Sequence, residues 1–426
     1  MRRNTKDAEL RERAAQVIPG GMYGHMSTAM LPEGYPQFFA KAEGTRITDV
    51  DGNVYIDFMC AYGPNLLGYR HPQVTAAVER QQALSDTVTG PGEPMVQLAE
   101  ALVGMVSHAD WAMFCKNGGD ATTMALMIAR ARQGKRKVLV AHKAYHGAVP
   151  WNTPRPGGVL PEDRAHLIYY DYNDPQALED AAKQAGDDLA GIFAAPFRHD
   201  TFADQELPDA EYARAARAVA DRHDALLIVD DVRAGLRLAR DCSWETLGVR
   251  PDLSAWGKVL GNGQPISALL GNDRAREAAQ KIFVTGSFWY SAVPMAAAVE
   301  TLRIVRETDY LEHLQRIGTL FRDGLHAQGR AVGLGVKSTG PATMPMVLFD
   351  EDPDFRLGYA FCQAALDRGV YLSPYHNMFI NAAMTEDDIR LTLEATGAAL
   401  EHVKKNRASI EPPAALAKMA ALVAEH

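Results

Sequence analysis

Short apolar runs alternate with longer amphipathic stretches through the middle of the chain. The apolar runs lie at 111–115, 137–141, 166–170, 191–195 and 226–229, and stretches with helical spacing lie between them at 121–133, 175–186 and 209–223. Strands that alternate with helices predict an α/β fold with a mostly parallel sheet. The run at 225–229 has no polar residue until its end, which is typical of a strand buried on both faces.

The two ends of the chain carry a different pattern, which predicts a smaller α+β domain. A polar helix is expected at 5–17, and the pair Asp51-Gly52 predicts a β-hairpin within 46–58. After Pro294 we expect a long helical run at 295–329, strands near 345–349 and 370–373, helices at 353–368 and 385–405, and an Ala-rich helix after Pro413. The predicted division is an N-terminal arm with part of the small domain at 1–60, a large domain at 61–300 and the rest of the small domain at 301–426.

Composition and charge narrow the class of protein. The 426 residues are 47% hydrophobic and 23% charged, which is ordinary for a globular protein, and the net charge of −9 with no basic run argues against nucleic-acid binding. Apolar windows are too interrupted to span a bilayer, and no secretory signal is recognisable. The four cysteines lack metal-type spacing, so we expect free thiols in the cytoplasm and no metal site.

Two residues near the middle of the chain point to cofactor chemistry. Asp230 ends the buried apolar run, where side chains reach the ligand-binding edge of a parallel sheet. Lys258 follows a second strand-like run, and Gly257 and Gly263 leave room for a planar group beside it. Pyridoxal phosphate requires a lysine amine for a Schiff base and an acid that keeps its pyridine nitrogen protonated. The alternative for each residue alone is a solvated lysine and a helix-capping acid.

Upstream motifs supply candidates for holding the cofactor's phosphate and ring. Asn117, Gly118 and Gly119 lie between a strand and a helix, where backbone N–H groups and the helix dipole bind anions. Tyr145 follows the next strand and can stack on a planar ring, while Val232 can contact its opposite face. An unoccupied turn and a core tyrosine are the alternatives at these positions.

The order and spacing of these motifs resemble the class III (fold-type I) pyridoxal-phosphate aminotransferases, in the branch that contains glutamate-1-semialdehyde aminomutase. The resemblance extends from Leu10 to Val403 and rests on Leu227–Arg237, Gly257-Lys258, Asn117–Ala121 and Tyr145–Gly147. It implies a large domain with a mostly parallel seven-stranded sheet and a smaller α+β domain built from both ends of the chain.

Carried over by position, the resemblance implies roles for individual residues. Lys258 would form the Schiff base, and Asp230 would hold the pyridine nitrogen. The remaining contacts are implied for Tyr145 and Val232 on the ring and for Asn117, Gly118 and Gly119 on the phosphate. Ser287 would reach the phosphate of a partner subunit, which implies a homodimer with shared active sites.

The chain departs from the aminomutase pattern at positions that contact substrate. Gly24–Ser27 stands where the aminomutase has a carboxylate-binding arginine, and Arg198 appears in a segment where the class commonly has Glu-Pro-Val. Bulky aromatic residues accompany these changes at Tyr23, Tyr62, Trp151 and Trp289. Together these features resemble the subgroup of hydrolysed-fumonisin aminotransferases, in which a long aliphatic amino polyol donates its amino group to pyruvate.

The resemblance therefore implies a transaminase that moves an amino group from a bulky or long-chain primary amine to a keto acid, with pyruvate as the expected acceptor. The freed Lys258 would carry the proton, because burial near cations lowers a lysine pKa toward neutrality. Candidates for the keto-acid carboxylate are Arg198, Arg233 and Arg237, of which Arg198 is favoured because it lies at a strand end. Candidates for the pocket border are His199, His376 and Asn377.

Other functions stay open on the sequence. The first is an intramolecular aminomutase of the glutamate-1-semialdehyde type, against which the missing arginine argues. The second is a β-amino-acid aminotransferase. A function of a different class would be a doubly wound small-molecule binder without covalent chemistry.

Overall fold

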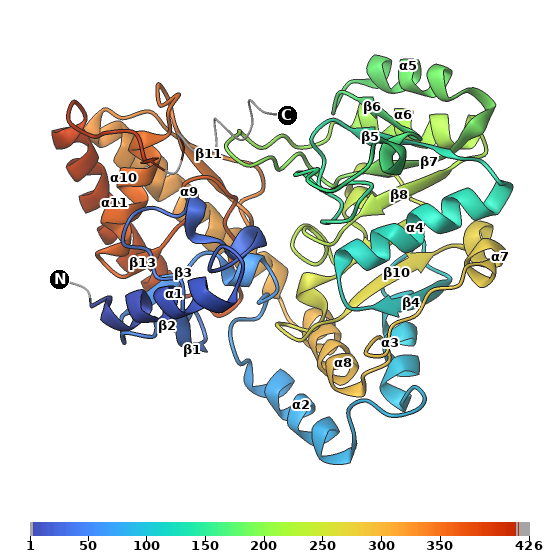
Figure 1. The fold of residues 1–426 in the computed structure, drawn as a ribbon, viewed down its shortest axis with the longest axis horizontal. Helices are drawn as coiled ribbons and strands as arrows, with labels where there is room; N and C mark the ends of the chain where they lie inside the picture. Colours follow the sequence, from blue (N-terminus) through green and yellow to red (C-terminus); the bar gives the residue numbers. More distant parts are fainter. Residues whose placement is uncertain (1–2, 415, 417–426) are drawn as a thin grey trace.

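A seven-stranded sheet forms the centre of the larger lobe in the computed structural model, which describes residues 3–414 and 416 (Figure 1). Its strand order is β4-β10-β9-β8-β7-β5-β6. The strands are β4 (Trp111–Cys115), β5 (Lys137–Ala141), β6 (Leu167–Tyr170), β7 (Leu189–Ala194), β8 (Leu226–Asp230), β9 (Leu253–Trp256) and β10 (Ser267–Gly271). Strand β10 runs antiparallel to both of its neighbours, and the remaining pairs are parallel. The predicted mostly parallel α/β sheet is confirmed.

Amphipathic helices cover this sheet. They are α4 (Gly118–Gln133), α5 (Pro175–Ala185), α6 (Ala210–Arg222) and α7 (Asp273–Lys281). Helix α4 packs against α7, and α5 packs against α6. In α5 the buried positions Leu178, Ala181, Ala182 and Ala185 follow helical spacing, which directs one apolar stripe toward the sheet.

The smaller lobe joins both ends of the chain, as predicted (Figure 1). Its four-stranded sheet contains β1 (Phe39–Glu43), β2 (Arg46–Asp49), β3 (Val54–Asp57) and β13 (Val370–Tyr371), and β13 pairs in parallel with β3. A separate hairpin is formed by β11 (Val336–Thr339) and β12 (Met346–Phe349). The helices of this lobe are α1 (Thr5–Val17), α9 (Tyr310–Val332), α10 (Arg356–Leu366) and α11 (Glu386–Asn406).

The helical run predicted at 295–329 is two helices. Helix α8 (Ala292–Glu307) ends at Thr308, whose backbone is extended and whose hydroxyl donates to the carbonyl of Ile304 over 2.7 Å. This local hydrogen bond satisfies the end of α8 and lets the chain turn before α9 begins. Helices α2 (Pro72–Leu84) and α3 (Glu93–Val103) pack against α8.

The predicted domain boundaries stay predictions, and the one at 300/301 falls within α8. Most of the Ala-rich helix predicted after Pro413 lies outside the described residues. Short 3₁₀ turns complete the described chain at η1 (Gly24–Met26), η2 (Thr28–Met30), η3 (Cys60–Tyr62), η4 (Pro161–Arg164), η5 (Gly186–Asp188), η6 (Ser243–Leu247) and η7 (Lys258–Leu260). Over residues 3–414 and 416, no helix has the length and hydropathy needed to cross a membrane.

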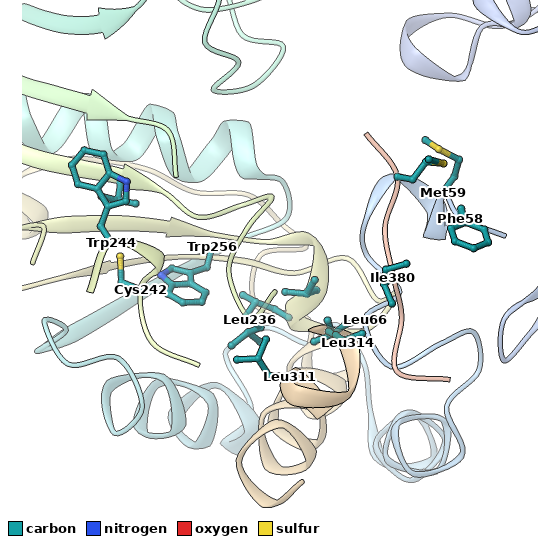
Figure 2. Packing of buried hydrophobic residues seen from close by; sticks show 14 of the residues in the cluster. Phe58, Met59, Leu66, Leu236, Cys242, Trp244, Trp256, Leu311, Leu314 and Ile380 are labelled. Atoms are coloured by element: carbon teal, nitrogen blue, oxygen red, sulfur yellow. The ribbon is translucent and has the colours of Figure 1, made fainter. Parts of the chain in front are cut away.

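One buried apolar cluster extends from the large sheet into the smaller lobe. Figure 2 shows Trp256 and Leu236 on the large-lobe side, Leu311 of α9 next to them, and Leu66 and Ile380 toward the smaller lobe. Burial of this kind stabilises a fold by about 25 cal/mol per Å² of apolar surface. The cluster thereby fixes the chain around Leu66 and Ile380 relative to the strand ends of the large sheet.

Candidate active site

The carboxyl end of β8 presents a buried aspartate with a defined partner. Asp230 Oδ2 lies 2.8 Å from Nδ1 of His146, and Oδ1 accepts the N–H of Val232 over 3.2 Å. The main-chain N–H of His146 donates to the Asn152 amide oxygen, which holds the imidazole in place. Because Asp230 accepts on both oxygens, its orientation at the strand end is fixed before any ligand binds.

Lys258 lies close to this acid and has no carboxylate partner within the described chain. It begins η7 with a left-handed backbone (φ +44°), and its Nζ donates to the carbonyl of Tyr62 over 2.7 Å. Burial, followed by the positive charges of Arg233 and Arg237, lowers the pKa of Lys258 to about 7, although Asp230 opposes the shift. A neutral amine is thus available near neutral pH, as the sequence predicts.

Two glycines near Asp230 pack closely against neighbouring side chains. A Cβ added at Gly118 would come within 2.6 Å of the Val232 side chain, and one at Gly257 within 2.6 Å of Ser267 Oγ. These glycines therefore let Val232 pack close to the backbone of both turns. The ring of Tyr145 is 39% exposed, and its pKa is raised by burial and by Asp230 against the opposing charge of Arg233. Val232 and Tyr145 are therefore both close to the strand-end acid.

The predicted anion-binding turn has the expected local structure. Asn117 is the N-cap of α4, and the carboxylate of Asp120 accepts its main-chain N–H over 2.9 Å. Gly119 packs tightly against Gly147, whose φ of +114° few side chains could adopt and whose added Cβ would lie 2.7 Å from the Gly119 Cα. A glycine turn that opens a 16-residue helix presents unpaired N–H groups and a positive dipole end to an anion.

The opposite side of the pocket consists of loops. Cys60, Ala61 and Tyr62 all have positive φ (48°, 55° and 63°), a run of strained conformations that places the Tyr62 carbonyl on Lys258. The Tyr62 hydroxyl donates to the carbonyl of His25 over 3.0 Å, and its ring meets those of His25 and His376 edge to face. Burial and the cations Lys258 and Arg233 lower the pKa of His25, and burial with Arg233 holds the pKa of His376 well below its usual range.

The remaining predicted substrate residues lie in different settings. Tyr23 is 73% exposed beside η1, and Trp289 packs its indole over Gly286. Trp151 is buried in the large lobe, where it stacks on His146 and donates from Nε1 to the Thr123 hydroxyl. The structure therefore brings Tyr62 to Lys258 and places Trp151 next to His146, the partner of Asp230.

The polar residues predicted for the site lie in two settings: some are exposed or paired with an acid, and others lie around Arg233. Ser287 is exposed in the segment between α7 and α8, and Arg198 forms an ion pair with Asp200 over 2.9 Å. His376 and Asn377 accept hydrogen bonds from Arg233 in the pocket. Burial and the charge of Arg233 hold the pKa of His199 well below its usual range, which also places His199 near the pocket.

Two functional candidates were not predicted. His146 holds Asp230, and His25 lies close enough to Lys258 for that charge to act on its imidazole. The signal for His146 was present in the Tyr145–Gly147 motif, where a histidine directly follows the ring-stacking tyrosine. For His25 the signal was weaker, namely an irregular segment rich in aromatic residues that precedes the hairpin.

The donor set matches the needs of pyridoxal phosphate: a carboxylate for the ring nitrogen, an amine with a pKa near neutrality, an apolar face on Val232 and a glycine turn for the phosphate. The comparison with protein families agrees, because residues 30–395 match the class-III aminotransferase family. The chain belongs to this family, and it is a pyridoxal-phosphate-dependent aminotransferase of fold-type I.

Individual relatives refine this assignment. The chain is 59% identical over 420 residues to aminopentol aminotransferase of Sphingopyxis macrogoltabida, covering 99% of this chain and 100% of that protein. The PLP internal aldimine form of the FumI protein from Sphingopyxis sp. MTA144 superposes with a TM-score of 0.96 at 60% identity, over 97% of this chain and 100% of that one. The glutamate-1-semialdehyde 2,1-aminomutase of Chlorobium phaeobacteroides is 30% identical over 428 residues, covering 93% of this chain and 98% of that protein.

Proposed function

We propose that this aminotransferase moves an amino group from a bulky or long-chain amino polyol to a keto acid, with pyruvate as the acceptor and Lys258 as the reacting lysine. The observation that carries the proposal is the Lys258 amine. Within the described residues its hydrogen bond goes to the Tyr62 carbonyl, and the charge of Asp230 acts on it. The similarity to aminopentol aminotransferase supports the choice of donor.

Each residue of the site has a task in this proposal. When bound, pyridoxal phosphate supplies an electron sink that stabilises negative charge at the carbon bearing the amine. Lys258 forms the covalent link in the resting enzyme, and its freed amine carries the proton from that carbon. Asp230, oriented by His146, keeps the pyridine nitrogen protonated. Tyr145 and Val232 would contact the cofactor ring, and Asn117, Gly118 and Gly119 would hold its phosphate.

The residues on the loop side support a hydroxylated donor that has no carboxylate. His25 is neutral near pH 7, because its pKa is lowered, and a neutral imidazole can both donate a hydrogen bond to a hydroxyl group and accept one from it. Tyr62, Tyr23 and Trp289 add aromatic surface for an aliphatic chain. His25 lies in the segment where the aminomutase has its carboxylate-binding arginine, which disfavours the aminomutase alternative.

A homodimer with shared active sites is also proposed. Large apolar side chains are exposed on two neighbouring segments, with Leu84 at 81% and Phe283 at 88%. Hydrogen bonds from Ala292 to Asp86 and between Thr87 and Ser291 tie these segments together. Exposed apolar surface of this kind commonly marks a protein interface, and Ser287 lies within it.

The four cysteines are all free, which supports a cytoplasmic location.

The test is a spectrophotometric screen of amines against the purified holoenzyme. We expect a long-chain amino polyol to discharge the cofactor absorbance and, with pyruvate added, to yield alanine. Turnover of a semialdehyde without any acceptor would instead support an aminomutase. Discharge by β-amino acids alone would support the β-amino-acid aminotransferase, and protein that stays colourless with added pyridoxal phosphate would contradict all three functions.

A further inference from the structure

The three arginines considered for the keto-acid carboxylate have different partners. Arg198 is neutralised by Asp200 at 2.9 Å, with Glu206 at 3.8 Å as a second acid. Arg237 is fully buried and donates to the carbonyls of Ile380 and Gly63. Its guanidinium also lies 5.0 Å from the centre of the Phe379 ring. The geometry thus gives Arg198 an ion pair and Arg237 a structural role between the two lobes.

Arg233 differs from both because its partners are neutral. Its NH1 group donates to Nε2 of His376 over 3.0 Å and to the amide oxygen of Asn377. His376 can accept there because its other nitrogen, Nδ1, donates to the Asn377 carbonyl over 2.6 Å. Of the described carboxylates only Asp230 acts on Arg233, at a distance beyond an ion pair, and that acid is engaged by His146.

This arrangement destabilises the charged form of Arg233. Burial lowers the pKa of Arg233 to about 10, so the guanidinium stays charged near neutral pH without a neutralising partner. A partly buried charge that lacks a counter-ion is unfavourable unless the function uses it. Arg233 also lies close to the reaction, since it is the charge that lowers the pKa of Lys258 most.

We propose that Arg233 is the receptor for the keto-acid carboxylate and that His376 and Asn377 hold its guanidinium ready without neutralising it. This inference rests on the proposed transamination and replaces Arg198 as the favoured arginine. A planar guanidinium binds a carboxylate through two parallel hydrogen bonds, and neutral supports leave its full charge for the substrate. The amino polyol has no carboxylate, so it does not need Arg233.

The decisive variants are Arg233→Gln, which removes the charge, and Arg233→Lys, which keeps it without the planar fork. We expect Arg233→Gln to raise KM for pyruvate about 10- to 100-fold, as for a lost charged hydrogen bond, with Arg233→Lys in between. Measured at a pH where Lys258 is deprotonated in each enzyme, the rate at which the amine discharges the cofactor should stay unchanged. Arg198→Gln is the matched control and should leave both steps unchanged.

A third variant tests the neutral support directly. Asn377→Asp keeps the size of the side chain but gives Arg233 an internal carboxylate, so pyruvate binding should weaken although the arginine is present. Thermal melting shows whether each variant folds. If Asn377→Asp does not fold, the contrast between the glutamine and lysine variants of Arg233 decides.

A binding measurement separates this inference from the proposed function. Oxamate has the size of pyruvate and cannot accept an amino group, so its affinity for the holoenzyme is measured by calorimetry without turnover. We expect oxamate binding to weaken about 10- to 100-fold in Arg233→Gln and to persist in Arg198→Gln. Unchanged oxamate affinity in Arg233→Gln would overturn the inference. An unsubstituted enzyme that makes no alanine from pyruvate would instead contradict the proposed acceptor.

Discussion

The two sides of the pocket are built in different ways. On the sheet side, Asp230 ends β8, Lys258 follows β9, and the turn predicted to bind an anion opens α4. On the loop side, a strained turn at Cys60–Tyr62 and the chain at 376–377 come from distant parts of the sequence. We expect the sheet side to hold the groups that every reaction of this cofactor needs, and the loop side to set which substrates reach them. Fold-level similarity therefore informs the first side better than the second.

The largest effect outside the lysine itself is expected from the acid of the sheet side. Asp230→Asn should reduce turnover on the order of 10²-fold or more, because the ring nitrogen loses its charged partner. Its neighbour Asp231 offers a matched control, since its carboxylate accepts the N–H of Ser243 over 2.9 Å and burial raises its pKa to about 6. Asp231→Asn should leave turnover close to that of the unsubstituted enzyme. Equal losses in the two variants, measured by steady-state kinetics, would contradict the role of Asp230.

The pH dependence of the half-reaction in which the keto acid accepts the amino group tests how the loop side acts on the sheet side. This step uses the free Lys258 amine, and a pKa of about 7 means that its rate should rise as the pH increases through that value. Arg233 lowers this pKa, so removing its charge in Arg233→Gln should raise the pKa and move the rise to higher pH. Arg198 does not act on Lys258, so Arg198→Gln should leave the profile in place. Single-turnover rates across the pH range check the order of the three profiles.

A smaller effect is expected from Gly118, the glycine that packs against Val232. Gly118→Ala would push against Val232, where the added Cβ meets the side chain at 2.6 Å. Overpacking of this kind costs about 1–3 kcal/mol, so pyridoxal phosphate should bind roughly tenfold more weakly. Gly157→Ala is the control, because nothing lies within 4 Å of its added Cβ. Cofactor titration of the apoenzymes measures both affinities. Equal affinities would show that the contact between Gly118 and Val232 does not limit cofactor binding.

The same contrast explains what the sequence could predict. Strand β8 and Asp230 could be predicted from the sequence. A strand buried on both faces leaves a clear pattern, namely a short continuous apolar run. The break at Thr308 was missed, since a single hydroxyl that bonds to the Ile304 carbonyl leaves no change in hydrophobic pattern. Among the arginines, position at a strand end favoured Arg198, whereas the structure shows that Asp200 neutralises it. Whether an arginine forms an ion pair depends on side-chain contacts, and the spacing of residues along the chain does not reveal these contacts.

The most direct measurement concerns the covalent link between cofactor and protein. The holoenzyme is reduced with borohydride, digested and analysed by mass spectrometry, with Lys258→Arg as the control protein. We expect the pyridoxyl mass on the peptide that contains Lys258 and no label in the control. A label on a different lysine in the native enzyme would contradict the account.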